Sequence, residues 1–155
     1  MTPAVLLMTE RSISFRLCEY EHDPANKNFG LEAAEALSLD PAQVFKTLIV
    51  LAGDEAMCAV VPVSRQLSLK SFAAAVGVKR VEMCPPARAE RATGYLVGGI
   101  SPIAQRRQLV TVIDETAQLY DEVFVSGGRR GLDIAISPTD LALVTGGIFS
   151  GIASE

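Results

Sequence analysis

Two apolar runs separated by a tight turn constrain the fold of this chain most strongly. Residues 47–51 and 57–63 are short, apolar and rich in β-branched side chains, a composition typical of buried strands. Gly53-Asp54 lies between them and is a favourable turn sequence. We therefore predict a β-hairpin over residues 47–63.

A helix start is predicted immediately before this hairpin. Asp40 is a good N-cap residue, Pro41 suits the first helical position, and Gln43 stands three residues after the cap, as in a capping box. Lys46 then falls where the helix gives way to the first strand. An ammonium group at the mouth of a buried strand either extends to water or contacts an anion, and its position leaves both interpretations open.

The remaining helix and strand signals do not alternate regularly along the chain. Helices are predicted after Thr2-Pro3, Asn28, Ser68 and Ser137-Pro138 and over residues 87–91, and strands over residues 14–20, 78–83, 93–97, 109–113, 123–126 and 132–137. This order disfavours a doubly wound parallel sheet. We predict an α+β fold, a single domain over residues 1–155 with a mixed or mainly antiparallel sheet and helices packed outside.

Composition excludes several classes of protein. The chain has 155 residues, of which 49% are hydrophobic, so it is able to bury a core and is not disordered. No apolar run is long enough to cross a bilayer, and the first residues lack the pattern of a secretory signal. The three cysteines are odd in number and widely spaced, as expected of reduced thiols. We expect a cytoplasmic protein with no membrane partner.

The charge of the chain is unevenly distributed. The net charge is −4, which argues against a protein that coats nucleic acid. Residues 79–107 nevertheless contain six basic residues and only two acidic ones, a local balance of +4. This stretch is either an ordinary solvated surface or a face that binds a polyanion.

Common catalytic motifs are missing. His22 is the only histidine, and it stands in a loop between Glu21 and Asp23, where we expect it to be solvated. No cysteine and histidine set has the spacing of metal ligands, and there is no phosphate-binding loop motif. The sequence therefore predicts neither a histidine base nor a bound metal.

Three features remain as candidates for a site. Lys46 is one, as a contact for phosphate or carboxylate. Gly98-Gly99 is the second, because adjacent glycines leave backbone N–H groups open to a ligand, although a plain turn explains them equally well. The third is the pair Ser126 and Asp133, which a hairpin through the glycine-rich segment 127–131 would bring together. Asp133 follows Leu132 in an apolar strand, so it needs a partner, either a ligand or a local hydrogen bond.

Taken together, these segments resemble one family. The chain is similar over nearly its whole length to the YbaK proteins, aminoacyl-tRNA deacylases related to the editing domain of bacterial prolyl-tRNA synthetases. Only the turn at Gly53-Asp54 looks shorter than in that family. The resemblance is carried by Tyr20-Glu21-His22-Asp23-Pro24, Asn28-Phe29-Gly30, Val44-Phe45-Lys46-Thr47-Leu48, Thr93-Gly94-Tyr95-Leu96-Val97-Gly98-Gly99-Ile100-Ser101-Pro102 and Ser126-Gly127-Gly128-Arg129-Arg130-Gly131-Leu132-Asp133.

The resemblance implies an enzyme that removes cysteine mischarged onto proline tRNA. It implies Lys46, Gly98 and Gly99 as catalytic residues, and a substrate pocket formed by Tyr20, Phe29, Thr47, Ser126 and Asp133. In the mechanism proposed for the family, the substrate thiol attacks its own ester and leaves as a thiolactone, so the reaction is classed as ester hydrolysis or as a lyase reaction. No enzyme nucleophile is then needed.

The resemblance also implies the partners. They are the acceptor end of an aminoacylated tRNA and prolyl-tRNA synthetase, with no cofactor and no metal, and we expect a monomer or a weak dimer. Two alternatives stay open. One is a sister enzyme that removes alanine from proline tRNA, which Gly98-Gly99-Ile100 disfavours because that group carries Gly-Ser there. The other is a non-catalytic tRNA- or nucleotide-binding module of the same fold.

Overall fold

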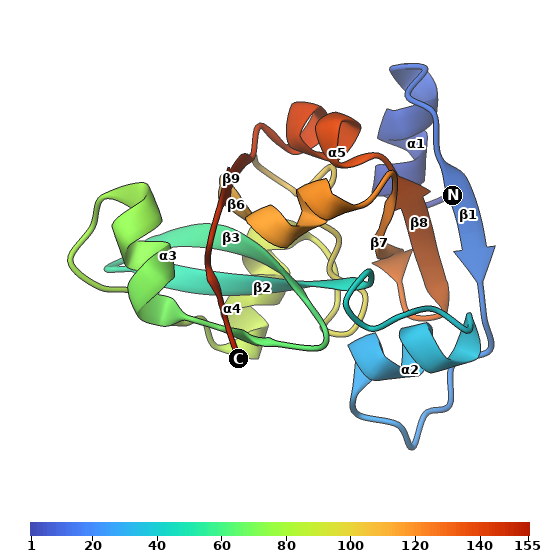
Figure 1. The fold of residues 1–155 in the computed structure, drawn as a ribbon, viewed down its shortest axis with the longest axis horizontal. Helices are drawn as coiled ribbons and strands as arrows, with labels where there is room; N and C mark the ends of the chain where they lie inside the picture. Colours follow the sequence, from blue (N-terminus) through green and yellow to red (C-terminus); the bar gives the residue numbers. More distant parts are fainter.

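The computed structural model describes residues 1–155 and contains five α-helices of two turns each (Figure 1). The helices and one 3₁₀ helix are α1 (Pro3–Glu10), α2 (Phe29–Ala36), α3 (Leu69–Val76), α4 (Pro86–Thr93), η1 (Glu115–Leu119) and α5 (Pro138–Thr145). Predicted caps are confirmed at Thr2, Asn28, Ser68 and Ser137, whose side chains accept a hydrogen bond from the first helical turn.

The strands form three sheets. The largest has the order β5-β2-β3-β6-β9, the second β1-β8-β7, and the smallest β10-β4. The strands are β1 (Arg16–Glu19), β2 (Phe45–Ala52), β3 (Glu55–Pro62), β4 (Gln66–Leu67), β5 (Glu82–Met83), β6 (Val110–Asp114), β7 (Val123–Arg129), β8 (Leu132–Ile136), β9 (Ile148–Ser150) and β10 (Ala153–Ser154). Because β6 runs parallel to β3 and to β9 while the other pairs are antiparallel, the predicted mixed α+β architecture is confirmed.

Both predicted hairpins are present. The β2–β3 hairpin pairs Phe45 with Pro62 at one end and Ala52 with Glu55 at the other, around the turn at Gly53. The β7–β8 hairpin pairs Val123 with Ile136 and continues to Ser126 opposite Asp133, after which a bulge shifts the register. These two hairpins lie in different sheets and supply facing walls of the protein interior.

Three local predictions are wrong. Residues 41–43 form a turn and not a helix, because Val44 and Phe45 already pair with β7 and β3. The Asp40 side chain accepts a hydrogen bond from the Ala42 N–H at 2.9 Å and closes an Asx turn. Residues 93–97 form no strand, since α4 extends to Thr93 and Gly94 ends it in a left-handed conformation. The strand expected over residues 78–83 is reduced to Glu82–Met83, which pairs only with the far end of β2.

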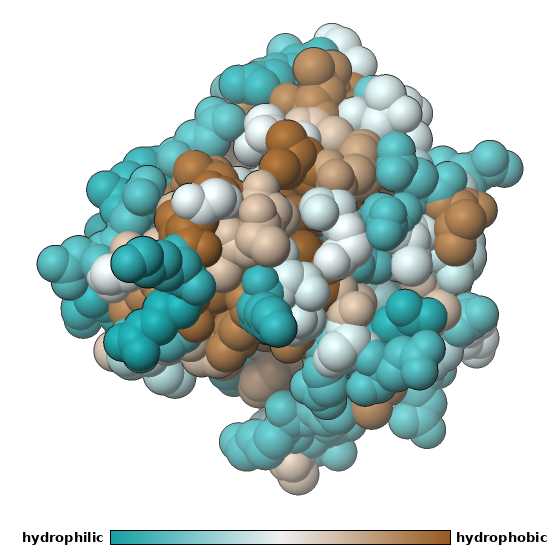
Figure 2. Space-filling view, turned by 60° about the vertical axis from the view of Figure 1, so that its left-hand side comes forward, coloured by the Kyte–Doolittle hydropathy of each residue, from teal (hydrophilic) through white to brown (hydrophobic).

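A shared core joins the two larger sheets. Its buried side chains come from one face of β2 and β3, from β7 and β8, and from α1 and α5, and include Phe45, Val60, Ile134 and Leu141. A second cluster covers the opposite face of β2 and β3 with Phe72 of α3, on the left of Figure 1. When that left-hand side is turned forward, apolar side chains occupy the middle of the visible face and hydrophilic ones border it (Figure 2). None of the helices is both long enough and apolar enough to span a membrane.

Candidate active site

One large pocket opens between the two hairpins. Its volume is about 580 Å³, within the range of sites that hold a small molecule or one nucleotide. Residues of the β1–α2 segment, the first half of β2, the N-terminal half of α4, the loop at Gly98 and the β7–β8 hairpin line it. Most of the wall is apolar, and its ionisable side chains are Tyr20, Lys27, Lys46, Cys84 and Asp133.

Seven of the eight predicted site residues meet at this pocket. They are Tyr20, Phe29, Lys46, Thr47, Gly98, Ser126 and Asp133. Gly99 does not line the pocket, and its N–H is already used in a turn, where it donates to the Leu96 carbonyl at 2.8 Å. The Gly98 N–H has no hydrogen-bond partner in the protein. Of the two glycines, only Gly98 both lines the pocket and has an N–H without a hydrogen-bond partner in the protein.

An open sheet edge forms one wall of the pocket. Strand β5 pairs with β2 only at Val50 and Leu51, and the adjacent Cys84 N–H donates to the Ile49 carbonyl at 3.0 Å. From Phe45 to Leu48 the outer edge of β2 has no paired strand, and these residues line the pocket. An unpaired edge presents backbone donors and acceptors, so this wall is able to hold a polar ligand in an otherwise apolar cavity.

Lys46 lies on this open edge, in β2, and not at a helix junction. Its side chain is half-buried, has no ion-pair or hydrogen-bond partner, and burial lowers its pKa from the ordinary value. Burial without a counter-ion disfavours the charged form of an ammonium group. An anion or a carbonyl oxygen that enters the pocket would therefore be a favourable partner for Lys46.

The hydroxyl of Thr47 is buried and also lacks a hydrogen-bond partner. Leaving a buried hydroxyl unpaired costs about 1–3 kcal/mol. Because Thr47 lines the pocket, a bound ligand is the natural source of the missing bond.

The β7–β8 hairpin brings Ser126 and Asp133 together, as the sequence predicts. They are direct partners in the register, and the Ser126 Oγ accepts a hydrogen bond from the Gly128 N–H at 3.2 Å. Asp133 is only 6% exposed, and its carboxyl oxygens have no hydrogen-bond partner in the protein. Burial raises its pKa to about 7, so this carboxyl changes charge near neutral pH.

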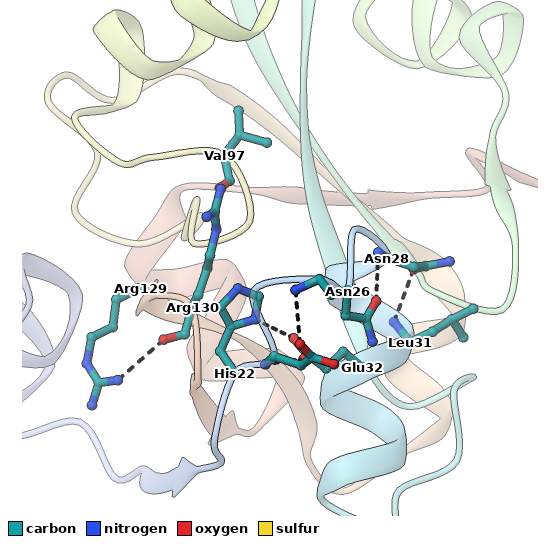
Figure 3. A network of polar contacts seen from close by, with 10 residues as sticks. His22, Asn26, Asn28, Leu31, Glu32, Val97, Arg129 and Arg130 are labelled. Carbon is teal, nitrogen blue, oxygen red and sulfur yellow. Dashed lines mark hydrogen bonds and ion pairs between the residues drawn. The ribbon is translucent and has the colours of Figure 1, made fainter.

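Arg130 contacts two residues of the pocket wall, Val97 and Phe29, which the sequence did not reveal. Its guanidinium donates two hydrogen bonds to the Val97 carbonyl, at 3.0 Å from Nε and 2.6 Å from Nη2 (Figure 3). It also lies 4.6 Å from the centre of the Phe29 ring. Arg130 thereby joins the glycine-rich hairpin tip to the Gly98 loop and to the start of α2.

His22 is not solvated as expected. Its Nδ1 lies 2.7 Å from the Glu32 Oε1, and the two side chains are only 17% and 8% exposed (Figure 3). The other Glu32 oxygen accepts a hydrogen bond from the Asp23 N–H at 2.8 Å. Glu32 projects from α2 and fixes the preceding loop, so His22 helps to hold Phe29 in place. In the sequence, this pairing is indicated only by Glu32, a carboxylate that follows the loop histidine His22 by ten residues.

The cysteines occupy three different environments. Cys58 is fully buried in β3, and burial raises its pKa to about 12, which excludes it as a nucleophile. Cys84 lines the pocket, and burial raises its pKa as well. Cys18 lies in β1, outside the pocket lining.

Gly98 provides a first test of how the pocket is built. Its φ is +90°, and a Cβ there would lie 2.6 Å from the Arg130 Nε and 3.0 Å from the Phe29 ring. We expect Gly98→Ala to lower the free energy of unfolding by about 1–2 kcal/mol through backbone strain and to abolish ligand binding by displacing both side chains.

Gly77→Ala is the matched control for Gly98→Ala. Gly77 also has a positive φ, +76°, but nothing lies within 4 Å of an added Cβ. Urea unfolding and activity measured side by side should show a loss of stability in both variants, the larger one for Gly98→Ala, and a loss of activity only for Gly98→Ala. Equal activity of the two variants would contradict the contact argument.

Comparison with known proteins identifies the family of the chain. The family model described as the aminoacyl-tRNA editing domain matches residues 27–143. The chain is 33% identical, over 99% of its length and 94% of the relative, to the Enterococcus faecalis protein named "Putative Cys-tRNA(Pro)/Cys-tRNA(Cys) deacylase EbsC". Among solved structures, hypothetical protein APE2540 is 26% identical with a TM-score of 0.87, covering 98% of this chain and 99% of that one.

A second solved structure has the same fold at lower identity. It is a "putative trans-editing enzyme for prolyl tRNA synthetase", 22% identical with a TM-score of 0.83, and the match covers 100% of this chain and 99% of that one. The matched family model includes α2, the open edge of β2, the Gly98 loop and the β7–β8 hairpin, that is, most of the pocket wall. The chain therefore belongs to the aminoacyl-tRNA editing family, the family of the YbaK proteins.

Proposed function

We propose that this protein is a trans-acting deacylase that removes cysteine from mischarged proline tRNA. The observation that carries the proposal is the content of the pocket, which joins an unpaired ammonium, an unpaired buried carboxyl and a free backbone N–H within one apolar cavity. An aminoacyl ester has complementary groups, since its amine is a cation and its carbonyl oxygen becomes negative during cleavage. The 33% identical relative is named for the same substrate class.

Each unpaired group of the pocket has a role in this proposal. The carboxylate of Asp133, beside Ser126, holds the α-ammonium group of the aminoacyl moiety. Lys46 and the Gly98 N–H face the ester carbonyl and stabilise the oxyanion. Thr47, Tyr20 and Phe29 enclose the short side chain, with the Thr47 hydroxyl as a hydrogen-bond partner for the substrate.

The proposed reaction uses the substrate's own thiol. The cysteine sulfur attacks the ester carbonyl, a C–S bond forms, and the bond between the carbonyl carbon and the ribose oxygen breaks. The thiol proton ends on the ribose hydroxyl, and the products are a cyclic thiolactone and uncharged tRNA. The enzyme supplies orientation and charge stabilisation, which agrees with a pocket whose one cysteine, Cys84, has a raised pKa.

Loss of the ester bond from two charged tRNAs tests the proposal. We expect rapid deacylation of Cys-tRNA(Pro) and slow deacylation of Ala-tRNA(Pro), because alanine has no thiol. Preferred cleavage of Ala-tRNA(Pro) would identify the sister activity, and cleavage of neither tRNA would indicate a binding module. The proposal includes prolyl-tRNA synthetase as the partner that produces the mischarged tRNA in the cytoplasm.

Blocking the substrate thiol tests the mechanism separately. We expect S-alkylated Cys-tRNA(Pro) to remain charged in the presence of the enzyme, because the attacking atom is no longer available. A methyl-sized blocking group keeps the steric change small. Undiminished deacylation of the blocked substrate would show that water, and not the thiol, attacks the ester.

A further inference from the structure

A second hollow lies on the opposite face of α4 from the pocket. Pro86 and Ala89 of this helix line the pocket, whereas Arg88, Arg91 and Ala92 line the hollow, together with Arg106 and Arg107 of the following loop. At 3.6 residues per turn, these two sets of α4 residues project in opposite directions. The hollow has a volume of about 280 Å³, and four of its five lining residues are arginines.

Three of the four arginines of this arginine hollow have no partner within the protein. Arg91, Arg106 and Arg107 have no ion-pair or hydrogen-bond partner for their guanidinium groups. Arg88 donates to the Asp54 carbonyl at 2.7 Å and lies 4.0 Å from the exposed Asp54 carboxylate. Converging positive charges are unfavourable unless an anion joins them. Arg91, Arg106 and Arg107 are exposed, so an anion from solvent is able to reach all three guanidinium groups.

The local structure holds these arginines together. The Arg106 N–H donates to the Thr93 carbonyl at 2.8 Å and fixes the loop against the end of α4. Glu90 is the only acid of the helix, and its Oε2 is engaged by the Val97 N–H at 2.8 Å, on the side of the Gly98 loop. The one carboxylate of α4 is thus kept for the pocket loop and does not neutralise the hollow.

Two arginines of the hollow, Arg88 and Arg91, lie near Cys84 of the pocket wall. Burial raises the pKa of Cys84, a pocket residue, while the positive charges of Arg88 and Arg91 act in the opposite direction. Both arginines belong to α4, the helix whose Pro86 and Ala89 line the pocket, so the hollow adjoins the pocket. The separation of the two sites is that of one helix, about 10 Å.

We propose that the arginine hollow binds a backbone phosphate of the single-stranded RNA end whose last nucleotide enters the pocket. The inference rests on the proposed function. One helix diameter separates the ester from the arginines, so the bound phosphate lies upstream of the terminal nucleotide. Guanidinium groups bind phosphate without reading a base, so this contact accepts the end of any tRNA and leaves selectivity to the aminoacyl pocket.

Binding of an uncharged oligonucleotide tests the inference without any catalysis. The probe is a fluorescein-labelled RNA tetranucleotide, ACCA, followed by anisotropy at several salt concentrations. We expect Arg91→Gln/Arg106→Gln to bind at least tenfold more weakly at low salt. The slope of log Kd against log salt should fall by about 0.7, because one phosphate contact on a single strand contributes about that much.

The control has the same change in net charge. Arg65→Gln/Lys70→Gln removes two exposed basic residues that lie outside both the pocket and the hollow, and it should bind like wild type. Equal affinity and equal salt slope in the arginine variant and in this control would overturn the inference.

A kinetic experiment separates this inference from the proposed function. The arginine variant should raise KM for Cys-tRNA(Pro) with little change in kcat, and it should hydrolyse cysteinyl-adenosine, which carries no phosphate, at the wild-type rate. A loss of activity on cysteinyl-adenosine would indicate damage to the pocket and would contradict the phosphate role. If the wild type does not cleave Cys-tRNA(Pro), the proposed function fails, while the tetranucleotide experiment still decides the inference.

Discussion

Replacing Lys46 with alanine is expected to abolish deacylation of Cys-tRNA(Pro) while leaving the protein folded. Removing one group that stabilises an oxyanion typically lowers kcat by about 100- to 1000-fold, and we expect a loss of this size. The measurement is single-turnover loss of the ester bond of Cys-tRNA(Pro), followed together with urea unfolding. Normal turnover by a folded Lys46→Ala variant would contradict the role proposed for this residue.

The structure explains why Lys46→Ala should not unfold the protein. The Lys46 ammonium has no ion-pair or hydrogen-bond partner, and burial already disfavours its charged form. Removing it therefore leaves no buried group unpaired. Lys70→Ala is the control, because Lys70 is exposed on α3 outside the pocket and should keep both activity and stability. Lys46→Arg keeps the positive charge but changes the shape of the side chain. If this variant is more active than Lys46→Ala, the loss of activity in Lys46→Ala is due to the lost charge.

Local sequence signals predicted much of the fold. Side-chain caps at Thr2, Asn28, Ser68 and Ser137 mark helix starts because they act within a few residues. Asp40-Pro41 carries the same signal but forms a turn. The reason is that Val44 forms a bridge with Phe124 of β7 and Phe45 pairs with Pro62 of β3, which leaves no room for a helix. Tertiary pairing here overrides a cap, as expected where local preference is worth about 1 kcal/mol.

The site was predictable only as far as its residues lie in recognisable segments. The hairpin placed Asp133 opposite Ser126, since a glycine-rich turn fixes which residues return to each other. The contacts of Arg130 with Phe29 and with the Val97 carbonyl join three segments that are distant in sequence, and no periodicity indicates them. The same holds for the open edge of β2, which exists because β5 is only two residues long.

Asp133→Asn is expected to stabilise the protein at pH 8 and to inactivate it. The pKa of Asp133 is raised from 3.8 to about 7 in the folded state, so the folded protein binds one more proton than the unfolded chain between these values. The free energy of unfolding of the wild type therefore falls as the pH rises from about 4 to about 7 and is level above that range. At about 1.36 kcal/mol per pKa unit, the stabilisation of the asparagine variant at pH 8 is on the order of 4 kcal/mol.

Urea unfolding at pH 4 and pH 8 measures this effect, and Asp121→Asn is the control because Asp121 is exposed. The Asp133→Asn variant should gain stability over wild type at pH 8 and match it at pH 4, while the control follows the wild type at both. In kinetics, kcat/KM of the wild type should decline as Asp133 gains a proton below about pH 7, and the residual rate of the variant should lack this step. A buried carboxylate that destabilises the free protein but is needed for activity is typical of a binding site. If the Asp133→Asn variant were as stable as wild type at pH 8 and fully active, Asp133 would neither destabilise the protein nor bind the substrate.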